Sequence, residues 1–238
     1  FFSSCDKIDG NPYVTPDNPT NPDDGDTIKK VLIIDFTGHR CPNCPQAAAT
    51  IDMLISTYGN RVIPISVHAG SFARPLSDFP SDYRTPFGTS FHNLAAPNYY
   101  PVGLIGTVDG TKKKPHDQWP ETVVAEKNKP TTLAINIDCS LTDNSIGASL
   151  KIKNTYPTLP LSNLRLYGIL LEDSIVSRQI NDTEIIENYV HNHVLRFGFT
   201  SHLGNSFSFN SLHEFDTTFS TTVTTNWRSN KLAVVAFI

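Results

Sequence analysis

The segment Cys41-Pro-Asn-Cys44 has the spacing of a redox-active cysteine pair. When C-x-x-C opens a helix, its first thiol lies near unsatisfied backbone N–H groups and the positive end of the helix dipole, and both favour the thiolate. Because the thiolate is the nucleophile of disulfide exchange, Cys41 is the candidate attacking group and Cys44 the resolving thiol. His39 and Arg40 precede the pair and can add positive potential. The motif predicts thiol–disulfide exchange, which needs no cofactor.

Two other uses of the pair stay open. The spacing also suits half of a structural zinc site, but Cys5 and Cys139 do not form a second pair, so we expect no metal. Cys139 lies among strand residues and is expected to be a small buried apolar side chain. A fixed disulfide that caps the helix is the second alternative. Burial of Cys41 beneath the loop at 69–98 would favour such a staple over a catalyst.

A strand and a helix must position the cysteines. Val31–Ile34 is a continuous apolar run, typical of a strand covered on both faces, and Gly38 ends it. From Gln46 the pattern is helical, because apolar residues recur at helical spacing: Ile51, Leu54, Ile55 and Tyr58.

The pattern Asp35-Phe36-x4-Cys41-x-x-Cys44 resembles the active-site strand and helix of thioredoxin-fold proteins. The resemblance implies that Asp35 is the proton acceptor for the buried thiol of Cys44. The alternative is an Asp35 that is hydrogen-bonded to the loop at Gly38. Thr37 and Arg40 stand where the family usually has aromatic residues, so the redox potential does not follow from the resemblance.

The next segments complete the predicted α/β part. Arg61–Val67 is a second strand, and Pro64 places it at a sheet edge on at least one side, because proline donates no ladder hydrogen bond. His68 follows it, either near the cysteines or as a structural histidine. A long loop with a helix at Thr89–Ala95 comes next, and a helix at Trp119–Lys127 ends this part. The thioredoxin resemblance implies a cis peptide at Pro101, packed against the cysteine pair.

Residues from 129 onward alternate in the manner of an all-β sandwich. The predicted strands are Thr131–Asp138, Ile146–Lys153, Asn163–Leu171, Ile175–Gln179, Tyr189–Phe197, Phe215–Thr224 and Leu232–Ile238. His191 and His193 would share one face of their strand, where Glu187 or His202 would be needed for a metal site. No three-ligand spacing is evident, so a polar sheet face is the simpler interpretation.

Two further segments carry a wider resemblance. Leu171–Gln179 with Tyr189–Arg196, and Asp35–His39 with Cys41–Pro45, resemble the outer-membrane-protein-28-related lipoproteins of Bacteroides-like bacteria. That family implies a thioredoxin-like domain at 31–128 and an immunoglobulin-like β-sandwich at 129–238, behind a lipoprotein signal remnant and flexible tether at 1–30.

The first residues and the composition agree with a cell-envelope location. Phe1-Phe-Ser-Ser-Cys5 resembles the end of a bacterial lipoprotein signal, so Cys5 is the expected lipidation site, with an incidental cysteine as the alternative. We expect an outer membrane lipoprotein, held to the membrane by this lipid and facing either side. The net charge of -4 without a basic stripe gives no reason to expect nucleic acid. The expected partner is a protein or small-thiol disulfide; a scaffold role is the alternative.

Overall fold

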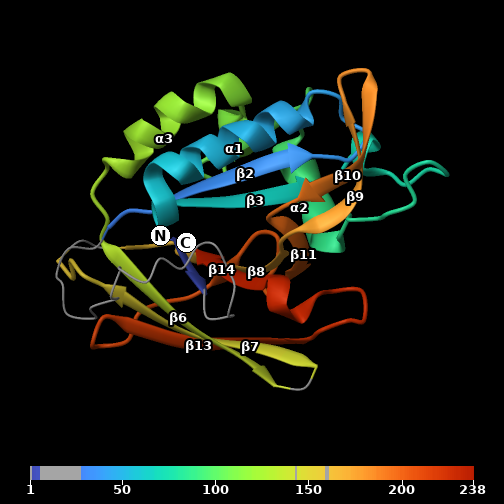
Figure 1. The fold of residues 1–238 in the computed structure, drawn as a ribbon. Helices are drawn as coiled ribbons and strands as arrows, with labels where there is room; N and C mark the ends of the chain where they lie inside the picture. Colours follow the sequence, from blue (N-terminus) through green and yellow to red (C-terminus); the bar gives the residue numbers. More distant parts are fainter. Residues whose placement is uncertain (1, 6–27, 143, 159–160) are drawn as a thin grey trace.

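The computed structural model describes residues 2–5, 28–142, 144–158 and 161–238 (Figure 1). Residues 6–27 of the predicted tether and the side chain of Cys5 lie outside the described part. The helices are α1 (Cys44–Tyr58), α2 (Pro86–Ala95) and α3 (Trp119–Lys127). The strands are β1 (Phe2–Cys5), β2 (Val31–Thr37), β3 (Val62–His68), β4 (Val102–Ile105), β5 (Lys114–Pro115), β6 (Leu133–Thr142), β7 (Ser145–Asn154), β8 (Arg165–Glu172), β9 (Ile175–Asn181), β10 (Glu184–His191), β11 (Val194–Gly198), β12 (Asn205–Ser206), β13 (Glu214–Thr222) and β14 (Leu232–Phe237).

One sheet runs through both halves of the chain, in the order β1-β14-β8-β11-β3-β2-β4-β5. β2 and β3 are parallel, β4 and β5 are antiparallel to their neighbours, and β11 joins β3 in parallel at Val194 and Ser66. The prediction that β3 is an edge strand is therefore wrong, because β3 lies between β2 and β11. At Pro64 itself, however, the side of β3 that faces β11 is unpaired among the described residues. The N–H of Ser66 donates to the His193 carbonyl at 2.8 Å, whereas the pairing with β11 does not extend back to Pro64.

Helices cover both faces of the central strands. Val31 and Ile33 pack in one core with residues of α1 and α3, while Leu32 and Ile34 pack in another with Phe91 of α2. Figure 1 shows α1 and α3 together on one side of β2 and β3. This arrangement explains why the Val31–Ile34 run is uninterrupted, because every side chain in it is buried.

A second layer lies beneath β8 and β14. The three-stranded sheet β13-β7-β6 packs against one face of these strands, with Ile152, Leu170 and Val234 in the shared core. Residues of the opposite face, such as Ile169, pack with α2 and the central strands. The coarse prediction of an α/β N-terminal part and a β-rich C-terminal region is confirmed.

Two elements differ in their boundaries from the sequence prediction. The predicted strand Tyr189–Phe197 is two strands, β10 and β11, separated by His193 with a left-handed φ of 57°. β9 and β10 then form a two-stranded sheet of their own. α2 begins at Pro86, where the Thr85 hydroxyl accepts the Gly88 N–H, and α3 spans the predicted residues.

Candidate functional site

The cysteine pair lies between the end of β2 and the start of α1. The Cys41 N–H donates to the Gly38 carbonyl at 2.9 Å, which closes the turn after the strand. Glycine is needed there because a Cβ on Gly38 would lie 2.5 Å from the backbone carbon of Phe72. Cys41 therefore lies in the turn, and Cys44 is the first helical residue, with Pro45 in the first turn. The two cysteines form a disulfide with a Cα–Cα distance of 5.4 Å.

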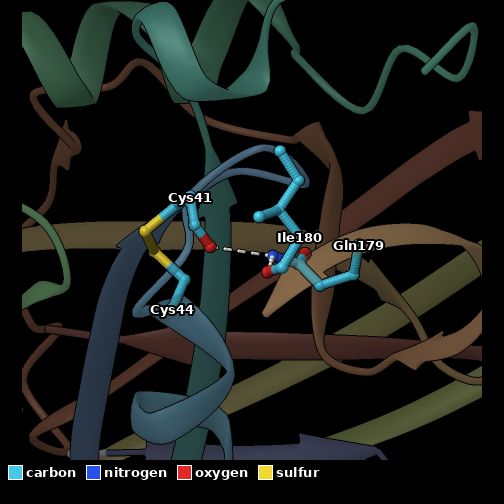
Figure 2. Close-up of a disulfide and its surroundings, with 4 residues drawn as sticks. All are labelled: Cys41, Cys44, Gln179 and Ile180. Atoms are coloured by element: carbon cyan, nitrogen blue, oxygen red, sulfur yellow. Dashed lines mark hydrogen bonds between the residues drawn. A yellow bond between two sulfur atoms is a disulfide. The ribbon is translucent and has the colours of Figure 1, made fainter. Parts of the chain in front are cut away.

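Both cysteines are buried: Cys41 is 1% exposed and Cys44 is 3% exposed. The β9–β10 hairpin covers them, with its Gln179 side chain donating to the Cys41 carbonyl at 3.0 Å (Figure 2). From the sequence we expected these two strands in a separate sandwich and any cover over Cys41 from residues 69–98. The sequence marks the hairpin turn by Asn181-Asp182, but no local pattern indicates which surface the hairpin contacts.

Asp35 faces a small cavity that it shares with Cys44. The cavity measures about 30 Å³, and Tyr189, His191 and Gln179 of the hairpin line its other side. Asp35 is 2% exposed, and its Oδ1 has no hydrogen-bond partner among the described residues. Burial raises the pKa of Asp35 to about 8. A carboxyl with such a pKa can both hold and release a proton near neutral pH.

The two residues before the pair contact the loop at 71–74 and the aromatic side chains beyond it. His39 is 1% exposed and stacks on Phe79 with ring centroids 5.5 Å apart. Burial is the main cause that lowers its pKa, which favours an uncharged ring. The Arg40 guanidinium donates to the carbonyls of Ser71 and Arg74. Of the two residues predicted to add positive potential near Cys41, Arg40 is therefore the one that carries a positive charge.

His68 lies at the end of β3 and lines the cavity of Asp35 and Cys44, which is the first of the two alternatives left open for this residue. It is 3% exposed and makes edge contacts with Tyr83 and His191. Burial, followed by the charge of His191, lowers the pKa of His68 well below its ordinary value. Burial also lowers the pKa of His191 to about 4. These rings are uncharged at neutral pH.

Other candidate residues take the following places. The Tyr100–Pro101 peptide is cis, as the thioredoxin resemblance implied, and Pro101 is buried directly before β4. His191 and His193 do not share a strand; the His193 N–H and Nδ1 lie 2.6 and 3.2 Å from Asp173 Oδ1. The described residues contain no group of three side chains suited to a metal ion. Cys139 is half-buried and disulfide-bonded, so it is not the buried free thiol expected.

A larger cleft opens beside the hairpin. Its volume is about 310 Å³, and its walls come from the hairpin on one side and the loop at 77–81 on the other. The hairpin contributes Ser177, Arg178 and Glu187, and the loop contributes Phe79 and Pro80 with their serine neighbours. Arg178 bridges the cleft, because it pairs with Glu187 at 2.7 Å and donates to the Asp78 carbonyl at 3.0 Å.

Two solved structures are similar to this chain. HBP35 of Porphyromonas gingivalis is 15% identical, with a TM-score of 0.68 over 90% of this chain and 70% of that chain, which shows a shared fold. An Agrobacterium tumefaciens protein solved by X-ray crystallography is 10% identical, with a TM-score of 0.46 over 82% of this chain and 79% of that chain. None of the curated proteins matches.

A protein-family model matches more than half of the sequence. The model describes outer membrane protein Omp28 and covers residues 93–238, which include the hairpin and all of the β-rich region. None of the described helices is long and apolar enough to cross a bilayer. The resemblance noted in the sequence is confirmed: the chain belongs to the outer membrane protein Omp28 family.

Proposed function

We propose that this outer membrane protein carries out thiol–disulfide exchange through Cys41 and Cys44. The observation that supports the proposal is the cavity shared by Asp35 and Cys44. A buried carboxyl without a hydrogen-bond partner for Oδ1 is costly in an apolar strand, and a purely structural disulfide gains nothing from it. A proton donor and acceptor beside the second cysteine is what disulfide exchange requires.

The chemistry can be followed from the disulfide form. A substrate thiolate attacks the Cys41 sulfur, the Cys41–Cys44 bond breaks, and Cys44 leaves as a thiolate that takes a proton from Asp35. A second thiol of the same substrate then releases Cys41. The substrate dithiol has become a disulfide and the cysteine pair has gained its two electrons. The two protons that the substrate thiols release to solvent restore the proton of Asp35 and protonate Cys41. In the reverse direction ionised Asp35 accepts the proton of Cys44 while Cys41 attacks a substrate disulfide.

We also propose the finer architecture that the sequence resemblance implied. The order β2, α1, β3, α2, β4, β5, α3, with the cysteine pair between β2 and α1, supports a thioredoxin-like part. The packing of β6, β7 and β13 against β8 and β14 supports an immunoglobulin-like sandwich that shares its sheet with the first part. The boundary at residues 128 and 129 remains a prediction.

A structural disulfide is the second candidate, and the burial of both sulfur-bearing residues favours it. In that case the protein acts as a scaffold or binding module. The reduction potential separates the two candidates. We expect equilibration with glutathione, read by alkylation and mass spectrometry, to give a value of about -120 to -270 mV. A potential below about -300 mV, or a disulfide that only denaturant makes reducible, contradicts the exchange proposal.

An Asp35→Asn variant tests the proton-transfer role directly. We expect the rate of exchange with a model dithiol polypeptide at pH 7 to fall about a hundredfold, since general acid–base catalysis contributes that much. Asp138→Asn, at an exposed position of β6, is the matched control and keeps the wild-type rate. An Asp35→Asn rate equal to wild type would remove the main support for catalysis.

Anchoring through a lipid on Cys5 remains a separate proposal. Intact-mass and peptide mapping under non-reducing conditions test it, because an S-linked diacylglycerol adds a large apolar mass to Cys5. The sequence has four cysteines and Cys41 pairs with Cys44, so a disulfide from Cys139 to Cys5 and a lipid on Cys5 exclude each other within one chain. A map that shows Cys5 bridged to another cysteine contradicts the anchor.

A further inference from the structure

The β9–β10 hairpin holds the loop of the cysteine pair mainly through backbone groups. The Ile180 N–H donates to the His39 carbonyl at 2.9 Å, and the Asp182 N–H donates to the Pro42 carbonyl at 2.9 Å. Gln179 adds its side-chain bond to the Cys41 carbonyl between them (Figure 2). Three of the four carbonyls from residue 39 to residue 42 are thus satisfied by the hairpin.

These bonds use an edge of the hairpin that its own ladder leaves free. Ile180 is directly opposite Ile185 in the antiparallel register. Opposed residues in such a ladder point their N–H groups either both inward or both outward. Because the Ile180 N–H leaves the ladder to reach His39, the Ile185 N–H points outward at the opposite edge. The contact with the cysteine loop can therefore be broken while the hairpin itself remains paired.

The hairpin is separable from the body of the protein. It forms a two-stranded sheet that does not join either larger sheet. Most β10 side chains are exposed, so little apolar burial holds the hairpin down. The cleft of about 310 Å³ also leaves its side toward the loop at 77–81 incompletely packed. In Figure 1 the hairpin projects beyond the ends of β2 and β3.

The base of the hairpin is firmly fixed. The Asp173 N–H donates to the Lys231 carbonyl at 2.9 Å, and the His193 carbonyl accepts the Ser66 N–H at 2.8 Å, so both ends of the hairpin are bonded to the body of the protein. Ser174 and His193 both have left-handed φ values, 59° and 57°, so the chain turns sharply where each strand of the hairpin meets the body. A fixed base and a weakly held tip are the parts of a hinged lid.

We infer that the β9–β10 hairpin is a gate over the Cys41–Cys44 disulfide, closed in this structure and hinged at Ser174 and His193. The inference rests on the proposed exchange function, because a gate is useful only over a reactive pair. When the gate opens, the carbonyls of His39, Cys41 and Pro42 exchange their hairpin donors for water, and the Cys41 sulfur becomes accessible to a thiolate. Accessibility of the disulfide is therefore set by the population of the open hairpin.

Ile180→Pro tests the gate at a single bond. Proline removes the N–H that reaches His39 and leaves the hairpin ladder intact, since that N–H is not used in the ladder. Ile185→Pro is the matched control, with the same substitution in the same residue pair but at the edge that faces away from the cysteines. Circular dichroism and the thermal midpoint verify that both variants fold.

The readout is the rate at which dithiothreitol reduces the pair in the full chain under native conditions. Dithiothreitol is oxidised to its cyclic disulfide while Cys41 and Cys44 become two thiols, which alkylation and mass spectrometry count. We expect Ile180→Pro to be reduced about five times faster than wild type, the factor that the loss of one net hydrogen bond gives. Ile185→Pro should keep the wild-type rate. Equal rates for all three proteins, or equal acceleration by both prolines, overturns the gate.

A second pair of variants decides the matter if Ile180→Pro does not fold. Arg178→Ala removes the bond from the hairpin to the Asp78 carbonyl, whereas Glu187→Gln removes only the ion pair within the hairpin. Faster reduction with Arg178→Ala alone supports the gate, and equal rates overturn it. This readout needs no substrate protein. A gate that opens over a pair unable to exchange disulfides would refute the proposed function and leave the hinged hairpin standing.

Discussion

Two carboxyl groups are buried to the same extent, but one lies between two cations and the other has none beside it in the described part of the chain. Asp35 and Glu172 are each 2% exposed. Glu172 lies at the end of β8 between two guanidinium groups: Arg196 Nε is 3.3 Å from Oε2, and Arg228 Nε is 3.3 Å from Oε1. Asp35 has no cation within ion-pair distance among the described residues, and its Oδ1 has no hydrogen-bond partner there.

The difference separates a carboxylate that supports the structure from one that is kept free to titrate. The Glu172 carboxyl pairs with Arg196 of β11 and with Arg228, so it connects β8, β11 and the segment before β14. Asp35 is held in a cavity with Cys44, where its pKa of about 8 makes a proton available at the pH of most cell surfaces. The comparison therefore identifies Asp35 as the unusual group of the two.

The largest effect is expected at Glu172. Glu172→Gln leaves the mostly buried Arg196 without its counter-charge, and breaking a buried pair costs about 3–5 kcal/mol of unfolding free energy. Urea unfolding measures this loss. Glu187→Gln breaks the exposed pair with Arg178 and should cost less than about 1 kcal/mol. A Glu172→Gln loss as small as that of the control would show that Glu172 is not a structural carboxylate.

Asp35→Asn should raise the free energy of unfolding, whereas Glu172→Gln lowers it. The folded protein holds the Asp35 proton up to about pH 8, while the unfolded chain releases it near the ordinary value of 3.8. The free energy of unfolding therefore falls as pH rises between those values. Asn removes this penalty, so the variant should gain a few kcal/mol over wild type above pH 8 and little near pH 4. Unfolding curves at several pH values test this, and a gain that does not depend on pH contradicts it.

His191 sharpens the comparison from the acid side. Burial lowers its pKa from 6.5 to about 4. Between pH 4 and pH 6.5 the unfolded chain therefore binds a proton at His191 that the folded protein does not bind. The stabilisation is present above pH 6.5 and lost as pH falls toward 4. His191→Gln should remove roughly 3 kcal/mol of the acid-dependent loss. The same pH series with His202→Gln as control measures it, and an unchanged acid limb would contradict a neutral His191.

Arg228 gives the smallest effect. Its side chain is 45% exposed, and its backbone N–H also donates to Glu172 Oε1 at 3.1 Å. Arg228→Ala keeps that backbone bond and the partner Arg196, so the loss should be about 1 kcal/mol. Urea unfolding of Arg228→Ala beside Glu172→Gln compares the two. A loss of several kcal/mol would show that Arg228, rather than Arg196, compensates the buried carboxylate.

Short sequence patterns predicted the elements whose formation depends on neighbouring residues in the chain. The Val31–Ile34 strand and the α3 helix follow from apolar runs and proline, whereas the placement of Asp35 beside Cys44 was implied by the thioredoxin resemblance. The sequence missed the cover over the pair, because Gln179 is 138 residues from Cys41 and nothing near either residue marks the contact. The pairing of β3 with β11 at Val194 was also missed. Pro64 prevents a ladder hydrogen bond only at its own position, so a neighbouring strand can still pair at Ser66.

The distance of 138 residues between Cys41 and Gln179 also has a temporal meaning. A chain made from its N-terminus extends at about 5–20 residues per second, so the cysteines exist on the order of ten seconds before the segment that covers them. During that interval the segment that later covers the two thiols has not yet been made. Once β9 and β10 pack over the pair, its oxidation and reduction depend on how often the hairpin opens.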